Sequence, residues 1–204
     1  MLFAGEADVF RHPDFDDHEQ VLFARDAAAG LRAIIAVHST ALGPAFGGCR
    51  MWPYRDEAEA LIDVLRLSRA MTYKAAICDL PYGGGKSVIL GDPRRDKTPA
   101  LLRAMGRVVD GLNGRYIIAE DIGTTLDDLR TMRTVTAHTA AATEAAGQPL
   151  PVTAFGVLQA IHAAVEHALG RSDLDGLRVA VQGLGNVGMP LCRYLAEAGA
   201  TARA

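Results

Sequence analysis

The chain has 204 residues, of which 50% are hydrophobic and 22% are charged, and its formal net charge is −3. This length and composition predict a normal buried core, in one large domain or in one domain and part of another. The charges of both signs are mixed along the chain, which gives no argument for a nucleic acid or an anionic membrane as a partner. We also expect no apolar run long enough to span a bilayer.

The first predicted elements are strands followed by a helix. Two apolar runs, 20–25 and 31–38, predict a pair of strands. The paired glycines of residues 43–48 predict a loop whose backbone can lie against a small ligand. Apolar residues then recur at helical spacing and predict an amphipathic helix over 56–73.

The next elements alternate between strand and helix. They are a strand over 86–90, a helix over 98–112, a strand over 115–119 and a helix over 124–132 that Thr124 or Thr125 caps. This alternation predicts a layered α/β fold for the first part of the chain.

A segment rich in Ala, Gly, Pro and Thr, from Thr139 to Pro151, is the best candidate for a linker. A helix over 151–169 and a strand over 177–182 are predicted after it. We therefore expect two domains: residues 1–150 form an N-terminal α/β domain, and residues 151–204 begin a second domain.

Two lysines and a carboxylate are the candidate chemical groups. Lys74 ends the MTYK motif, Lys86 directly follows three glycines, and Asp121 follows the strand over 115–119. A lysine placed by glycines is expected to lie close to the backbone, poorly shielded and free to approach a ligand. Near a second cation, or in a desolvated site, it gives up its proton more easily and can act as a base. The alternative is that both lysines are solvated surface residues and that Asp121 only stabilises the start of a helix.

The segment Gly183-Leu184-Gly185-Asn186-Val187-Gly188 is a GxGxxG motif between a buried-type strand and a predicted helix. That context is typical of a dinucleotide-binding βα unit, in which the helix N-terminus faces the pyrophosphate. Such a site also needs an acidic residue about twenty positions further on. The sequence ends at Ala204 before that position, so we expect a C-terminally truncated, incomplete Rossmann domain.

Two other kinds of site are not indicated. The histidines at 38, 138 and 162 have no metal-ligand spacing, so we expect no metal site. The three cysteines, Cys49, Cys78 and Cys192, are widely spaced with no CxxC motif. This pattern is typical of reduced thiols and predicts a cytoplasmic protein.

Seven motifs occur in the order found in one enzyme family. They are GGCRMW at 47–52, MTYK at 71–74, GGGK at 83–86, GLNGRY at 111–116, AEDIGT at 119–124, PVTAFGV at 151–157 and QGLGNVG at 182–188. Through them the chain, from about residue 20 to 204, closely resembles the glutamate/leucine/phenylalanine/valine dehydrogenase family, and within it the leucine dehydrogenase branch.

The resemblance implies an NAD-dependent, reversible oxidative deamination of a branched-chain L-amino acid to its 2-oxo acid and ammonia. It also implies a homo-oligomer whose partners are small molecules. Lys86 resembles the catalytic lysine, and Asp121 resembles the carboxylate that moves protons to and from nitrogen. The implied substrate-binding residues are Lys74, Met71, Gly47 and Gly48, with Lys74 at the substrate carboxylate. The implied cofactor-binding residues are Thr153, Gly183, Gly185, Asn186, Val187 and Gly188.

Some alternatives stay open at this stage. Phe46 and Ala119 resemble wall positions of the side-chain pocket, where an aliphatic residue is more usual than Phe46, so the preferred amino acid is undecided. The residue that separates NAD from NADP lies beyond Ala204. With an incomplete cofactor domain we expect little or no turnover from these 204 residues alone, since positioning supplies much of the rate. The competing interpretation is a non-catalytic remnant that binds an amino acid or joins an oligomer.

Overall fold

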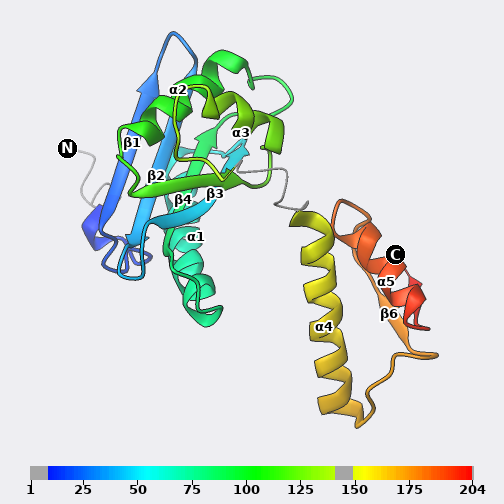
Figure 1. Ribbon diagram of the computed structural model, residues 1–204. Helices are drawn as coiled ribbons and strands as arrows, with labels where there is room; N and C mark the ends of the chain where they lie inside the picture. The colour runs from blue at the N-terminus through cyan, green and yellow to red at the C-terminus, as the bar shows by residue number, and fades with distance from the viewer. Residues whose placement is uncertain (1–8, 141–148, 204) are drawn as a thin grey trace. The chain divides into compact units, whose positions relative to one another are not determined.

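The structure, a computed structural model, describes residues 9–140 and 149–203 (Figure 1). The chain divides into two compact units, residues 1–141 and 142–204, and each unit is described by itself below. The linker expected from Thr139 to Pro151 falls largely on residues 141–148, which lie outside the described residues. The expected domain boundary at residue 150 therefore stays a prediction.

A five-stranded sheet forms the centre of the first unit, with the strand order β1-β2-β4-β3-β5. The strands are β1 (Gln20–Asp26), β2 (Leu31–Ser39), β3 (Ala45–Trp52), β4 (Gly83–Leu90) and β5 (Tyr116–Glu120). The pairs β1–β2 and β2–β4 are antiparallel, whereas β4–β3 and β3–β5 are parallel. The predicted strand pair is confirmed as β1 and β2, and the predicted α/β layers are confirmed as well.

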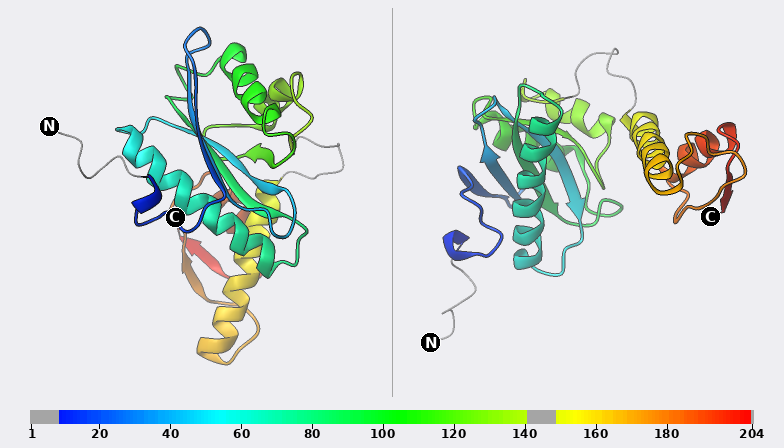
Figure 2. Two further views of the ribbon diagram at one scale, coloured as in Figure 1. Left: turned by 90° about the vertical axis from the view of Figure 1, so that its left-hand side faces the viewer. Right: turned by 90° about the horizontal axis from the view of Figure 1, so that it is seen from below.

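Helices cover both faces of this sheet, as Figure 2 shows. The helices are α1 (Glu57–Ile77), α2 (Pro99–Asp110) and α3 (Leu126–Arg133), after a short 3-10 turn at Val9–Arg11. Apolar residues of α1 pack on Ile34 and Val88 on one face, and those of α2 and α3 pack on the other face around Ile89 and Ile118. Side-chain caps from Asp56, Thr98 and Thr125 begin the three helices.

The prediction of a loop over 43–48 is wrong from Ala45 onward. Ala45–Trp52 is strand β3, which lies between β4 and β5. The glycines are there because the neighbouring strands leave no room for side chains. A Cβ added at Gly47 would lie 1.7 Å from the carbonyl oxygen of Gly85. Glycine inside a strand often marks such a close approach of another backbone.

Two element boundaries differ from the prediction by more than two residues. Helix α1 continues four residues past the predicted end, to Ile77, so that Lys74 lies inside its last turn. Strand β4 begins at Gly83 and contains all three glycines. A Cβ at Gly84 would lie 2.1 Å from Oγ1 of Thr72, which shows that α1 lies directly on this strand.

The second unit is a βαβ arrangement with one preceding helix. It consists of α4 (Pro149–Leu169), β6 (Arg178–Ala180), α5 (Gly188–Glu197) and β7 (Thr201–Arg203), with β6 and β7 parallel. Its core contains Ala154 and Leu158 of α4 together with Leu191 and Leu195 of α5. The predicted strand–glycine turn–helix order is confirmed, and it is the start of a Rossmann-type fold.

We expected no apolar run of membrane-spanning length, and this is wrong, because one helix is long enough and apolar enough to span a bilayer. The segment Val152–Leu169 of α4 is an 18-residue stretch with a mean hydropathy of 1.2. Length and composition alone do not separate a spanning helix from an apolar helix of a soluble protein. The prediction of no membrane partner is therefore neither confirmed nor contradicted.

Candidate functional site

Lys86 and Asp121 form the centre of the candidate site in the first unit. Lys86 lies in the middle of β4, and Asp121 directly follows β5. The Lys86 Nζ lies 2.9 Å from Oδ2 of Asp121, and the two side chains are only 8% and 21% exposed. The expectation of a poorly shielded lysine is thus wrong: Lys86 is buried, and it contacts a carboxylate.

Gly48 makes this contact possible. Strand β3 lies between β4 and β5, so the two side chains must meet across it. A Cβ at Gly48 would lie 2.7 Å from Cβ of Asp121 and 3.1 Å from Nζ of Lys86. Only glycine leaves the space in which the lysine and the carboxylate approach each other.

A tight turn after β5 fixes the backbone of Asp121. The backbone N–H of Asp121 donates to Oγ1 of Thr124 at 3.0 Å, and that hydroxyl donates to the carbonyl of Cys49 at 2.7 Å. Gly123 has a φ of +82°, and a Cβ there would lie 2.0 Å from the Met51 carbonyl oxygen. The turn therefore ties the carboxylate to strand β3.

Asp121 stays ionised in this setting. Burial by itself would raise the pKa of Asp121, but the positive charges of Lys86 and Arg50 outweigh burial and hold the pKa below its ordinary value. The result is a buried carboxylate that carries its negative charge at neutral pH.

A second cation, Arg50, was interpreted from the sequence as core packing with an exposed tip. In the structure its Nε lies 3.0 Å from Oδ2 of Asp121, and its Nη1 lies 2.8 Å from Oδ2 of Asp63. Sequence reasoning missed this role, because the glycines of β3 had indicated a loop. Strand alternation would have put residues 48 and 50 on one face.

The expected substrate-binding residues lie around the end of α1. Gly47 is buried in β3, and a Cβ there would lie 3.4 Å from Cγ of Met71. Lys74 is exposed one turn beyond Met71 on the same helix, which brings the two side chains to one side of it. The expected effect of Lys74 on Lys86 stays a prediction.

The hydroxyl of Tyr116 supports the strand under this region. Its Oη donates to the Gly47 carbonyl at 2.8 Å and lies 3.0 Å from Oγ of Ser87. Tyr116 is completely buried, so that its ring and hydroxyl fix the backbone of the site from the opposite side of the sheet.

The predicted cofactor residues belong to the second unit. Gly183 has a φ of +90°, and a Cβ at Gly188 would lie 1.9 Å from the Gly183 carbonyl oxygen, so both glycines are required by the turn. Gly185 has open space around it, and the N-cap Val187 makes no side-chain bond to the N-terminus of α5. A helix N-terminus without a side-chain cap and a glycine that lets the backbone come close to a ligand are both features that suit binding of a pyrophosphate. Asn186 in the turn and Thr153 on α4 are both exposed.

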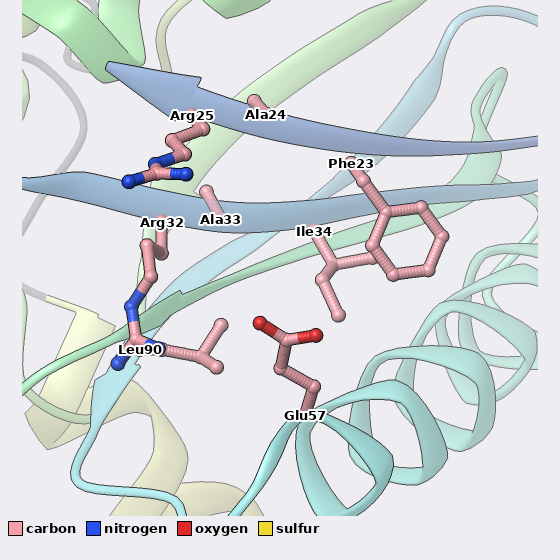
Figure 3. A pocket seen from close by; sticks show the side chains of 8 residues that line it. All are labelled: Phe23, Ala24, Arg25, Arg32, Ala33, Ile34, Glu57 and Leu90. Atoms are coloured by element: carbon pink, nitrogen blue, oxygen red, sulfur yellow. The ribbon is translucent and has the colours of Figure 1, made fainter. Parts of the chain in front are cut away.

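One cavity of about 390 Å³ lies away from these residues, over β1 and β2 and beside the first turn of α1 (Figure 3). Arg25, Arg32 and Glu57 place charged groups around it, and Phe23 and Ile34 add apolar walls. None of the sequence-predicted site residues lines it.

The two units together define an α/β protein with a buried lysine–aspartate pair in one unit and a dinucleotide-type glycine turn in the other. Family models match both parts. The model for the Glu/Leu/Phe/Val dehydrogenase dimerisation domain matches residues 18–138, and the model for glutamate/leucine/phenylalanine/valine dehydrogenase matches residues 149–204. The chain belongs to the Glu/Leu/Phe/Val dehydrogenase family, as its motifs had indicated.

Individual relatives agree with this assignment. Leucine dehydrogenase of Geobacillus stearothermophilus is 52% identical over 95% of this chain and 53% of its own length. The crystal structure of L-tryptophan dehydrogenase from Nostoc punctiforme is similar, with a TM-score of 0.68 and 50% identity over 91% of this chain and 53% of that one. The hetero-hexameric glutamate dehydrogenase of Thermus thermophilus, in a leucine-bound form, has a TM-score of 0.74 and 25% identity over 91% and 49%. The chain thus spans about half the length of these relatives.

Proposed function

We propose that the protein is an NAD-dependent amino acid dehydrogenase that reversibly deaminates a branched-chain L-amino acid, of the leucine type, to its 2-oxo acid and ammonia. The observation that supports this most is the buried pair of Lys86 and Asp121, with Nζ and Oδ2 2.9 Å apart. A relative named leucine dehydrogenase, 52% identical to the chain, supports the substrate class.

The pair suits the two proton transfers of this reaction. Asp121 takes a proton from the substrate ammonium, so that the nitrogen lone pair is free when the Cα hydrogen departs as hydride and the C=N bond of the imine forms. Water then adds to the imine carbon and gives a proton to Lys86 Nζ. Asp121 returns a proton to the nitrogen. Ammonia then leaves as the C=O bond of the 2-oxo acid forms, and the carbinolamine hydroxyl gives its proton to the Asp121 carboxylate.

The distance within the pair links these steps. A separation of 2.9 Å between Nζ and Oδ2 is within the range for direct proton transfer. A proton can therefore pass between Lys86 and Asp121 without an intervening water.

Substrate binding is assigned to groups at the end of α1 and in β3. Within residues 9–140 and 149–203, no carboxylate lies at ion-pair distance from Lys74, so its ammonium is available for the substrate carboxylate. Met71, Gly47 and Gly48 are proposed to line the cleft. The Phe46 ring, which lies 5.2 Å from that of Tyr82, is the candidate for contact with the substrate side chain.

The second unit is proposed to hold the cofactor. The N–H groups of the turn Gly183–Gly188 and of the start of α5 would bind the pyrophosphate, and Thr153 would lie near the nicotinamide. Bound NAD supplies the acceptor for the hydride. We further propose a homo-oligomer, which the dimerisation-domain match over residues 18–138 supports. We also propose a cytoplasmic location, which the widely spaced cysteines support.

The test is reduction of nicotinamide by the purified protein with NAD and leucine, valine, isoleucine or phenylalanine. We expect turnover with a branched-chain substrate from a form of the protein that contains a complete cofactor-binding domain. Lys86→Ala should lower kcat by about 10²-fold or more, the usual contribution of a general base. The matched control is Lys97→Ala, which removes a lysine paired with Asp128 at 2.7 Å and should leave kcat unchanged.

The alternative function, amino acid binding without catalysis, predicts a different pattern. Leucine would bind in a calorimetric titration, Lys74→Ala would abolish that binding, and no nicotinamide would be reduced. If leucine neither binds nor reacts, both the proposed function and this alternative are wrong.

A further inference from the structure

Arg50 bridges two carboxylates that come from different parts of the chain. Its Nε contacts Asp121, which follows β5, and its Nη1 contacts Asp63, which lies on α1. The Arg50 side chain is 20% exposed, so these charge-assisted bonds lie largely out of solvent. A planar guanidinium that binds through two of its three nitrogens has little freedom to turn.

Tyr54 secures the far end of this bridge. Its hydroxyl donates to Oδ2 of Asp63 at 2.6 Å, and that same oxygen accepts from Arg50 at 2.8 Å. Burial and the neighbouring carboxylate of Asp63 raise the pKa of Tyr54, so the hydroxyl keeps its proton and remains a donor. A continuous chain of contacts therefore runs from Lys86 through Asp121, Arg50 and Asp63 to Tyr54.

The two cations that bind Asp121 are not equivalent. Both contact Oδ2, with distances of 2.9 Å from Lys86 Nζ and 3.0 Å from Arg50 Nε, which leaves Oδ1 outside both ion pairs. A lysine can release its proton, but a guanidinium does not do so in proteins. Whenever Lys86 is neutral, as its role as a base requires, Arg50 is the cation that remains beside the buried carboxylate.

We propose that Arg50 is a positioning residue for Asp121, held in place by Asp63 and Tyr54. In the part of the cycle in which Lys86 has lost its charge, Arg50 keeps the carboxylate fixed in direction, and ionised until it takes the substrate proton. This inference rests on the proposed function for the proton transfers, but the effect of Arg50 on Asp121 is a property of the protein without substrate.

The experiment compares Arg50→Lys, Arg50→Gln, Asp63→Asn and Tyr54→Phe. The matched control is Arg66→Gln, which removes an arginine from a surface pair with Asp14 at 2.8 Å. Three quantities are measured: the titration of the Asp121 carboxyl carbon by NMR without substrate, the midpoint of thermal unfolding, and kcat and KM against pH.

We expect Arg50→Gln to raise the pKa of Asp121, since one of the two cations that oppose burial is then lost, and to lower kcat by about 10²-fold, as a misplaced catalytic group does. Arg50→Lys should keep the pKa of Asp121 low, because the charge is retained. It should still lower kcat by about 10-fold or more, because one ammonium does not span both carboxylates as the fork does. Asp63→Asn and Tyr54→Phe should lower kcat with a smaller change in KM.

Two results would overturn the inference. One is an unchanged titration of Asp121 in Arg50→Gln. The other is a loss of kcat that only follows the loss of folded protein, as a purely structural tie between β3 and α1 would give. If the unmodified protein shows no turnover at all, the proposed function fails, and the Asp121 titration alone decides whether Arg50 controls this carboxylate.

Discussion

Replacing Tyr116 with Phe removes one hydroxyl group that contacts the backbone of the candidate site. The Tyr116 Oη has a single proton, and the Gly47 carbonyl at 2.8 Å can only accept it. Oγ of Ser87, 3.0 Å away, must then be the donor to Oη. Burial raises the pKa of Tyr116, so this pattern holds at neutral pH. The substitution leaves the Gly47 carbonyl and the Ser87 hydroxyl each short of one partner.

The expected loss follows from these two groups. The Ser87 hydroxyl has a second neighbour in the thiol of Cys49 and can turn toward it, so one buried polar group stays uncompensated. Such a group costs about 1–3 kcal/mol, and we expect that loss in the free energy of unfolding of the first unit. We also expect weaker substrate binding, because Gly47 lines the proposed cleft.

The single tryptophan, Trp52, lies at the end of β3 in the first unit, so its fluorescence during urea unfolding reports on that unit alone. Tyr73→Phe is the control: this ring is 60% exposed, and its hydroxyl is already in water, so the change should stay within about 0.5 kcal/mol. A Tyr116→Phe loss no larger than that of the control would refute the assigned hydrogen bonds.

Three further predictions use the same unfolding assay. His18 is buried, and burial is the main reason that its pKa is lowered. Below about pH 6.5 the unfolded state therefore binds a proton that the folded state does not, so the free energy of unfolding should fall with pH until the folded-state pKa is passed. If His18→Gln showed the same slope of stability against pH, this assignment would be wrong. Gly84→Ala places a Cβ 2.1 Å from Oγ1 of Thr72 and should lower the free energy of unfolding by about 1–3 kcal/mol through overpacking. In the control Gly111→Ala, the added Cβ lies 3.4 Å from its nearest neighbour, the Val108 carbonyl oxygen, and the free energy of unfolding should not fall. Thr98→Ala removes the cap that accepts from the N–H of Leu101 at 3.1 Å and should cost about 1 kcal/mol, which Thr98→Ser should largely restore.

Local patterns were enough to predict most of the elements. The apolar runs of β1 and β2, the helical spacing of α1 and the glycine turn before α5 are each contained in fewer than about twenty-five neighbouring residues. Periodicity and turn residues are signals of that range. The family motifs could be recognised for the same reason, since each is a short run of adjacent residues.

The predictions failed where a residue's role depends on distant parts of the chain. The glycines of β3 indicated a loop, because nothing in the neighbouring sequence shows that Gly85 and Asp121 occupy the space their side chains would need. Lys86 was expected to be poorly shielded by neighbouring side chains. Its burial could not be read from the neighbouring sequence, because it comes from the packing of α1 and β3 on β4.

The sequence by itself therefore determined the family and the order of the elements, and it selected Lys86 and Asp121 as the proposed reactive pair. Only the tertiary structure decided that Asp121 binds Arg50, 71 positions away in the chain, and that Asp63 and Tyr54 hold that arginine. The physical reason is that ion pairs and buried hydrogen bonds depend on distances of about 3 Å, and the order of strands in the sheet sets those distances.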